Sequence, residues 1–244
     1  MRVVHFDSLE STNKYCEALD LAQVEDFTCF WADEQTAGIG QRGNHWHSAP
    51  GENLTFSLVV KPAFLPSSRQ FLLTQALSLA IVDCLAPFHL PESPSIKWPN
   101  DIYVGGCKIC GTLVSAALQG DAMSSAVCGI GLNVNQSRFP DWVPNPTSLS
   151  LLTGTRYDLE PLLNRMLVCI EARYAALKAG TDPKPDYMAS LLNLGKWARY
   201  AFHGREVRAR IDDVDSYGRL LLTTDDSGRL CCGLKEIALL PALL

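Results

Sequence analysis

Three glycines between residues 38 and 43 read G-I-G-Q-R-G, which matches the G-x-G-x-x-G pattern of phosphate-cradling dinucleotide loops. That pattern works only with a strand before it and a helix opening on it. After the loop, Pro50 and Gly51 break any helix, and residues 54–60 have the β-branched and aromatic content of a strand. The sequence therefore predicts strand, glycine loop and strand, and argues against a dinucleotide site. A plain surface loop and a loop for another phosphate compound both stay open.

Two basic side chains, one inside this loop and one much later in the chain, could neutralise phosphate charge. Arg42 lies inside the loop and offers forked, permanently charged N–H donors. Lys108 is a point cation on a flexible stem, suited to a place between a carboxylate and a phosphate. Glycines lack a Cβ, so backbone N–H groups in the loop can approach phosphates closely. By itself, however, Lys108 next to a Gly-Gly turn is more often a solvated hairpin lysine.

Five short blocks follow one another along the chain. They read S-T-N at 11–13, Q-T-A-G-I-G-Q-R-G-N-H-W at 35–46, K-W-P-N-D at 97–101, K-I-C-G-T-L-V at 108–114 and G-I-G-L-N at 129–133. With these blocks in this order, the chain resembles the biotin protein ligases over almost its whole length. The resemblance implies that biotin and MgATP form biotinyl-5′-AMP, and that biotin is then transferred to a lysine of a biotin carboxyl carrier protein.

The resemblance also implies roles for single residues. Lys108 is expected to be the main catalytic cation, with Arg42 as a second catalytic group. Ser11, Thr12 and Asn13, which alone would be an ordinary helix cap, are expected to bind the ureido head of biotin together with Gln35.

The nucleotide is expected near the later blocks. Asn100 and Asp101 are expected to organise magnesium or the ribose, and Lys97 either pairs with Asp101 or faces the nucleotide. Asn133 is expected on the adenylate side, and Trp142 is a candidate lid over the adenine. No protein ligand set for a metal ion is predicted. The other expected binding positions are Gly38, Gly40, Gln41, Gly43, Trp46 (equally a core residue), Gly111 and Gly131.

Three positions depart from the family pattern. Ile39 stands where an arginine is usual, Gln41 where some members have arginine, and Ser115 where a glutamate is frequent. An arginine that helps to hold the adenylate is thus absent. We expect a working enzyme that releases the mixed anhydride more readily.

The composition limits the partners and the compartment. The 244 residues carry a net charge of −5, which argues against a broad basic surface for DNA. No apolar run approaches the roughly 18 residues of a membrane span, and the N-terminus lacks a signal-peptide pattern. A cytoplasmic protein without DNA or membrane partners is expected, with no N-terminal helix-turn-helix. A homodimer is compatible with the sequence.

The nine cysteines are an odd number in a chain without secretory features, and we expect free thiols. Cys107 and Cys110 form a single C-x-x-C between a Gly-Gly turn and a strand. Because no second pair follows and no helix begins there, structural zinc and thioredoxin-like redox chemistry are both disfavoured.

The hydrophobic pattern predicts the elements that must position these residues. We expect a helix from 12 to about 22 with Tyr15, Ala18 and Leu19 buried, and a largely buried helix after a Ser67-Ser68 cap. An amphipathic helix is expected over 159–177. Strands are expected at 3–6, 28–32, 54–60, 96–98, 102–104, 109–118, 126–134, 207–211, 220–223 and 230–234.

These elements predict an α+β fold with two domains. Residues 1–195 should form a catalytic domain with a mixed β-sheet and packed helices, resembling class II synthetases. For residues 196–244 the family implies a small SH3-like β-barrel.

Two alternatives stay open: a related enzyme, which would be a lipoate or octanoate ligase, and, from a different class, a catalytically weak biotin-binding protein. The Lys-Trp-Pro-Asn-Asp block and the C-terminal β module argue against the first. The presence of both Arg42 and Lys108 argues against the second.

Overall fold

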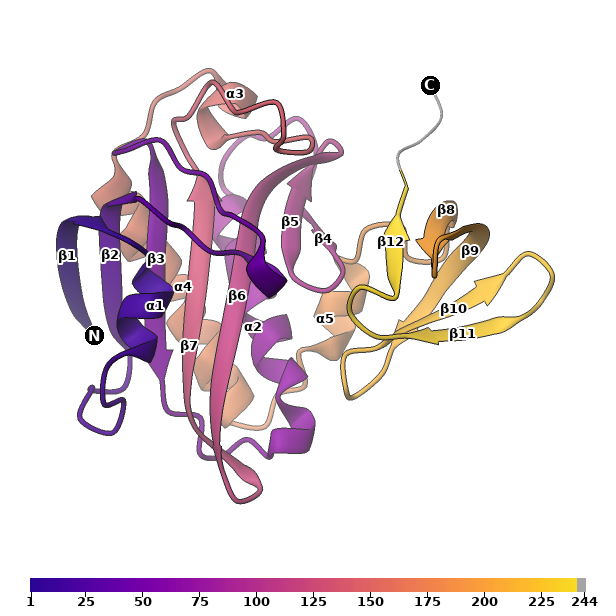
Figure 1. Cartoon of the computed structure of the whole chain (residues 1–244), viewed down its shortest axis with the longest axis horizontal. Helices are drawn as coiled ribbons and strands as arrows, with labels where there is room; N and C mark the ends of the chain where they lie inside the picture. The colour runs from indigo at the N-terminus through magenta and orange to yellow at the C-terminus, as the bar shows by residue number, and fades with distance from the viewer. Residues whose placement is uncertain (241–244) are drawn as a thin grey trace.

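The computed structural model describes residues 1–240, apart from the side chain of Arg42. Seven strands form one sheet in the order β1-β2-β3-β7-β6-β5-β4 (Figure 1). The pair β1–β2 is parallel and the other neighbours are antiparallel, so the predicted mixed sheet is confirmed. The strands are β1 (Arg2–Leu9), β2 (Thr28–Gln35), β3 (Asn53–Val60), β4 (Ser95–Lys97), β5 (Asp101–Val104), β6 (Cys107–Gln119) and β7 (Ala122–Asn133).

Helices cover the two faces of this sheet unequally. The long helices α2 (Phe71–Leu85) and α4 (Leu159–Lys178) pack on each other behind the sheet, whereas the short α1 (Thr12–Glu17) lies on the other face (Figure 1). Two further short helices, α3 (Leu149–Thr153) and α5 (Lys184–Ala189), were not predicted. The face that carries α1 is thus left partly open, and the glycine loop crosses it.

The central strand β3 shows why the two faces differ. Its even-numbered side chains from Leu54 to Val60 are apolar and belong to the core under the long helices. Its odd-numbered residues Asn53, Thr55 and Ser57 are also buried, but they are polar and point to the face of α1. The period of two therefore gives the sheet one dry face and one face with hydrogen-bonding groups.

Two sequence predictions about helices are wrong. The first helix ends at Glu17 and not near residue 22, because Asp20 accepts the backbone N–H of Ala22 and turns the chain. Ala18 is accordingly exposed, and Cys16 is the apolar residue that α1 buries. The serines at 67 and 68 belong to a short 3₁₀ turn (Ser67–Arg69), and they make no side-chain cap for α2.

The C-terminal part forms a second, antiparallel sheet of the expected small SH3-like kind, in the order β11-β10-β9-β8-β12. Its strands are β8 (Trp197–Phe202), β9 (Arg205–Val214), β10 (Leu220–Thr224), β11 (Arg229–Cys232) and β12 (Ile237–Leu239), of which β8 and β12 were not predicted. The indole Nε1 of Trp98 donates to the carbonyl of Gly218 at 2.9 Å, and Lys184 pairs with Asp213 at 2.8 Å. The small sheet is therefore fixed beside the β4–β5 end of the large one.

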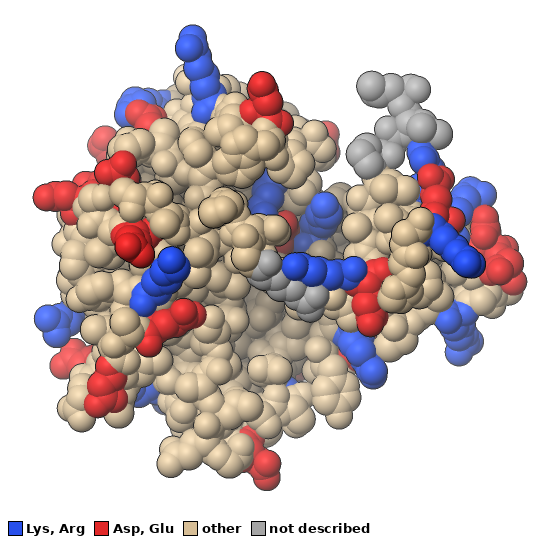
Figure 2. Space-filling view, in the orientation of Figure 1, with Lys and Arg blue, Asp and Glu red and all other residues tan. Residues whose placement is uncertain are grey.

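All nine cysteines are free thiols, as predicted. Within residues 1–240, no helix is both long and apolar enough to cross a membrane. On the face shown in Figure 2, acidic and basic side chains are intermixed over the surface.

Candidate active site

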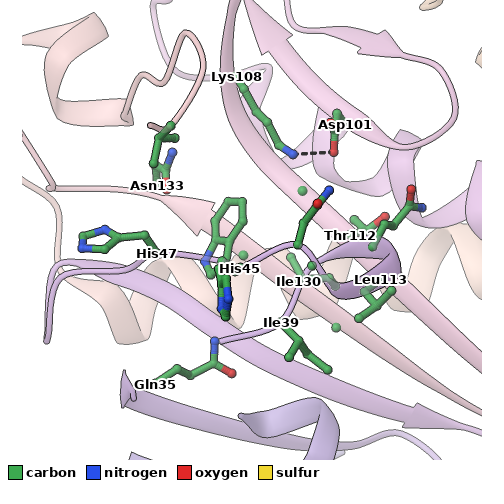
Figure 3. Close-up of a pocket in the computed structure, with 18 of the residues that line it drawn as sticks. Gln35, Ile39, His45, His47, Asp101, Lys108, Thr112, Leu113, Ile130 and Asn133 are labelled. Atoms are coloured by element: carbon green, nitrogen blue, oxygen red, sulfur yellow. Dashed lines mark ion pairs between the residues drawn. The ribbon is translucent and has the colours of Figure 1, made fainter. Parts of the chain in front are cut away.

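A cavity of about 610 Å³ opens on the sheet face that carries α1 (Figure 3). The glycine loop, which crosses this face (Figure 1), lines the cavity. This volume suits a ligand of the size of a nucleotide or a drug. Most of the predicted site residues line it: Ser11, Thr12, Asn13, Gln35, Gly40, Gln41, Gly43, Trp46, Lys97, Asp101, Lys108, Gly111, Gly131, Asn133 and Trp142.

One end of the cavity, which we call the amide end, consists of Thr12, Asn13 and Gln35 with Ser57 beneath them. Gln35 Oε1 accepts hydrogen bonds from the backbone N–H and the hydroxyl of Thr12, at 2.8 and 3.1 Å. The hydroxyl of Ser57 lies 2.8 Å from Thr12 Oγ1 and 2.5 Å from Asn13 Oδ1. Asn13 Nδ2 is buried without a protein partner. This end therefore offers a neutral donor to a ligand, held by a network of other neutral groups.

The floor of the cavity is made of glycines on β6 and β7. Gly111 and Gly131 are cross-strand partners, and the indole of Trp46 lies on them. A Cβ on Gly131 would come within 2.3 Å of that ring, so only glycine permits this contact. Likewise, a Cβ on Gly129 would collide with the amide of Asn13. The G-x-G pattern of β7 is explained by these two close approaches.

The opposite end, which we call the lysine end, carries charge. Lys108 Nζ lies 2.7 Å from Asp101 Oδ1 and 5.6 Å from the centre of a ring of Trp46 (Figure 3). Lys97 does not pair with Asp101, and its Nζ instead donates to the hydroxyl of Tyr103 at 3.3 Å. Burial lowers the pKa of Lys97, an effect that Asp101 opposes. Burial raises the pKa of Tyr103 to about 12, so its phenol stays protonated.

Segment 144–147 borders the lysine end. The backbone N–H of Lys108 donates to Asn145 O at 2.7 Å, and that of Thr147 donates to Lys108 O at 2.9 Å. Asn133 Nδ2 donates to Thr147 O, whereas Asn133 Oδ1 is buried without a protein partner. Trp142, in the same proline-rich loop, is 60% exposed. Its ring meets His47 edge-on, with centroids 6.1 Å apart.

The glycine loop is folded on itself. Gly40 N–H donates to Asn44 O at 2.7 Å and Trp46 N–H to Gly38 O at 2.9 Å, around a 3₁₀ turn (Gln41–Gly43). These two N–H groups are therefore already bonded within the loop, contrary to the idea that the loop backbone as a whole is free to wrap phosphates. The side chain of Arg42 lies outside the described part of the structure.

Two predicted binding residues do not line the cavity. Gly38 allows the backbone crossing with Trp46, because a Cβ there would lie 2.5 Å from the carbonyl oxygen of Trp46. Asn100 is buried, and its Nδ2 donates to Thr112 O at 2.8 Å. Both residues support the site from outside it.

Sequence analysis missed Ser57 and Tyr103. The polar residues at alternate positions of β3 were a signal for Ser57, because a strand buried on both faces is usually apolar throughout. For Tyr103 the sequence offered no signal, since an aromatic residue in a strand is ordinary. The cavity also has His45, His47, Phe139 and Val143 in its lining.

Comparison with known proteins gives the family. The model of the biotin/lipoate A/B protein ligase family matches residues 5–133. The bifunctional ligase/repressor BirA of Bacillus subtilis is 33% identical over 245 residues, which cover 96% of this chain and 71% of BirA.

The chain belongs to the biotin/lipoate A/B protein ligase family. Another relative of this ligase is the biotin–(acetyl-CoA-carboxylase) ligase of Mycobacterium tuberculosis. It is 33% identical over 203 residues, covering 81% of this chain and 73% of that protein. The fold is that of the biotin protein ligase from Aquifex aeolicus, solved in complex with biotin and ATP. The TM-score is 0.81 at 24% identity, with 99% of both chains covered.

Proposed function

We propose that this ligase joins biotin to ATP, giving biotinyl-5′-AMP and pyrophosphate, and then transfers biotin to a lysine of a biotin carboxyl carrier protein. The observation that carries the proposal is the division of one cavity into a neutral, buried amide end and a charged lysine end with a glycine floor between them. The names of the curated relatives support biotin as the acid and a carboxylase as the source of the acceptor.

In the first step, a carboxylate oxygen of biotin attacks the α-phosphorus of ATP, and the bond from that phosphorus to the bridging oxygen of pyrophosphate breaks. Lys108 has three N–H donors, so its bond to Asp101 leaves others for the carboxylate and the α-phosphate. A fixed cation at the place where charge builds up lowers the barrier. The ureido head of biotin, a neutral donor and acceptor, would bind at the amide end near Asn13 Nδ2.

In the second step, a neutral lysine amine of the acceptor attacks the carbonyl carbon of the mixed anhydride. The carbon–oxygen bond to AMP breaks, the nitrogen loses a proton, and an amide forms. Trp46 and Trp142 would limit the access of water to the anhydride.

Magnesium would enter with the nucleotide. Among the described residues that line the cavity, Asp101 is the one carboxylate, and no group of three metal-ligating side chains occurs in the described part of the chain. This donor set suits Mg²⁺, which commonly takes one or two carboxylates together with substrate phosphates. The ion would supply charge neutralisation on the triphosphate, with Asp101 as its protein contact.

Ile39 lines the cavity in place of a basic residue, which supports a shorter lifetime of the bound adenylate. We also propose that the catalytic domain ends near residue 195, where the chain passes from α5 to β8.

The test is ATP–pyrophosphate exchange by the purified protein with biotin, lipoate and octanoate in parallel. We expect exchange with biotin alone, followed by biotin transfer to a carrier domain. Exchange with lipoate or octanoate instead would assign the protein to the other branch of the family. Binding of biotin without exchange would show a site that has lost its chemistry.

A further inference from the structure

Among the described residues, the lysine end contains two lysines but one carboxylate. Lys108 forms an ion pair with that carboxylate, Asp101, at 2.7 Å. Within the described part of the chain, no carboxylate lies within ion-pair distance of Lys97, and its hydrogen-bonding partner is the neutral phenol of Tyr103 at 3.3 Å. The Nζ of Lys97 also lies 5.1 Å from the centre of the Tyr103 ring. Lys97 is therefore a positioned cation without an ion-pair partner among the described residues.

A cation in such a place has an energetic cost. Lys97 is half-buried, and Tyr103, with 8% of its surface exposed, covers it from β5. Removing a charge from water is unfavourable unless a partner compensates it. A phenol contributes a dipole and not a charge, and the nearby Lys108 repels Lys97. An anion that enters the cavity would supply the missing partner.

The order of the strands indicates which part of a ligand this anion is. Neighbouring strands lie about 4.8 Å apart, so the strand order gives the distance of each strand from the amide end across the sheet. Gln35 on β2 and Ser57 on β3 belong to the amide end, and β7, β6, β5 and β4 follow in that order. Lys97 lies on the edge strand β4, farther across the sheet than Lys108 on β6, the lysine proposed to meet the reacting carboxylate and α-phosphate.

We propose that Lys97, held by Tyr103, forms a subsite for the pyrophosphate leaving group of the nucleotide. The inference rests on the proposed function, because it takes the acid to bind at the amide end. Breaking the bond between the α-phosphorus and the bridging oxygen leaves the new negative charge on pyrophosphate, and Lys97 stabilises that charge. Tyr103 is a positioning residue, which acts through Lys97 and needs no contact with the ligand.

The two lysines then have separate tasks. Lys108, fixed by Asp101 and Trp46, serves the reacting centre in both directions of the reaction. Lys97 serves the leaving group alone and has no part in the second step, where pyrophosphate is already gone. This separation gives the subsite an experimental signature.

The experiment measures the half-saturating concentration of pyrophosphate in the exchange reaction. Lys97→Met should raise it at least tenfold, and Tyr103→Phe should raise it severalfold. Lys97→Arg should restore most of the affinity, because it keeps a cation. The double variant Lys97→Met/Tyr103→Phe should have the same half-saturating concentration of pyrophosphate as Lys97→Met, since Tyr103 acts through Lys97. Lys178→Met, at the end of α4 far from the cavity lining, is the matched control and should behave as the wild type.

Two further measurements separate this role from a structural one. The dissociation constant of biotin and the rate of transfer from chemically prepared biotinyl-AMP involve no pyrophosphate, so Lys97→Met should alter each less than twofold. An unchanged half-saturating concentration of pyrophosphate in Lys97→Met would overturn the proposed subsite. Equal losses in pyrophosphate affinity, biotin affinity and transfer rate would overturn it as well. If the wild type shows no biotin-dependent exchange, the proposed function fails. The subsite is then tested by calorimetric titration of wild type and Lys97→Met with tripolyphosphate, where equal affinity would overturn it.

Discussion

At the amide end of the cavity the polar side chains are buried and bonded to one another, whereas at the lysine end they are partly exposed and charged. Thr12 and Asn13 are 2% and 4% exposed, and the hydroxyl of Ser57 below them is within hydrogen-bonding distance of both. The side chains of Lys108 and Asp101 are 26% and 30% exposed.

The difference follows from the cost of burial. Neutral groups can be removed from water when their hydrogen bonds are satisfied inside the protein, so the amide end can be shaped before a ligand arrives. Cations without full compensation are far more costly to bury. The lysine end therefore keeps contact with water and receives much of its countercharge from the ligand. If this is right, substitutions at the two ends should affect different steps.

The largest effect is expected from Lys108→Ala. Loss of a fixed charge donor typically costs about 2.7–4 kcal/mol of barrier, so biotin-dependent exchange should fall by roughly 10²–10³-fold. Calorimetry should find that biotin affinity falls much less than the exchange rate, because Lys108 contacts only the carboxylate of biotin and the ureido head binds at the other end. Lys178→Ala is the control, and a wild-type exchange rate in Lys108→Ala would show that the lysine end does no chemistry.

The complementary change is Asn13→Ala at the amide end. It removes the buried donor Nδ2 and leaves the hydroxyl of Ser57 without one acceptor. We expect biotin affinity to weaken by about 1–3 kcal/mol, with the exchange rate at saturating biotin changed much less. Ser57→Ala should weaken binding by a smaller amount in the same titration. Biotin affinity equal to the wild type in both variants would contradict the assignment of the two ends.

A smaller effect is expected from Trp98→Phe, which tests whether the contact between the two sheets contributes to stability without affecting biotin binding at the amide end. The change removes the hydrogen bond from the indole to Gly218 O. The free energy of unfolding should decrease by about 0.5–1.5 kcal/mol in urea denaturation. At 25 °C, the biotin dissociation constant should stay the same, since none of the hydrogen bonds described for the amide end involves a residue of that sheet. A weaker biotin affinity with an unchanged free energy of unfolding would contradict this expectation, because it would mean that the contact between the sheets affects the site and not the stability.

The smallest effect concerns the thiols around the cavity. Burial raises the pKa of Cys16, behind the amide end, and of Cys128, next to the glycine floor, to about 12. Since only the thiolate reacts, its fraction at pH 8 is very low, and it grows only as the pH rises toward that value. Iodoacetamide at pH 8 should therefore label the exposed Cys231 first. Early labelling of Cys16 or Cys128, found by peptide mass spectrometry, would mean that the sheet face opens in solution.

Much of the fold could be predicted from local patterns. The β-branched and aromatic content of β3 and the apolar spacing of α4 each span enough residues to define an element. The short helices α3 and α5 have five and six residues, too few for a clear period. The first helix was predicted too long because Ala18 and Leu19 continue the apolar spacing. The turn at Asp20 is formed by short-range hydrogen bonds, from Ala22 N–H to its carboxylate and from Gln23 N–H to its carbonyl oxygen.

The kinds of groups at the site and their order along the chain follow from the amino-acid sequence: capping hydroxyl and amide residues, a glycine loop, two lysines and a glycine-bearing strand. Which of these groups bond to one another is visible only in the folded chain. Asp101 is the cross-strand neighbour of Lys97 but bonds Lys108. Asn100 donates to the backbone of Thr112 outside the cavity, and Tyr103 holds Lys97. The physical reason is that residue type and spacing set the direction of a side chain on its own strand. The choice of partner depends on the register of neighbouring strands and on which groups compete for one acceptor.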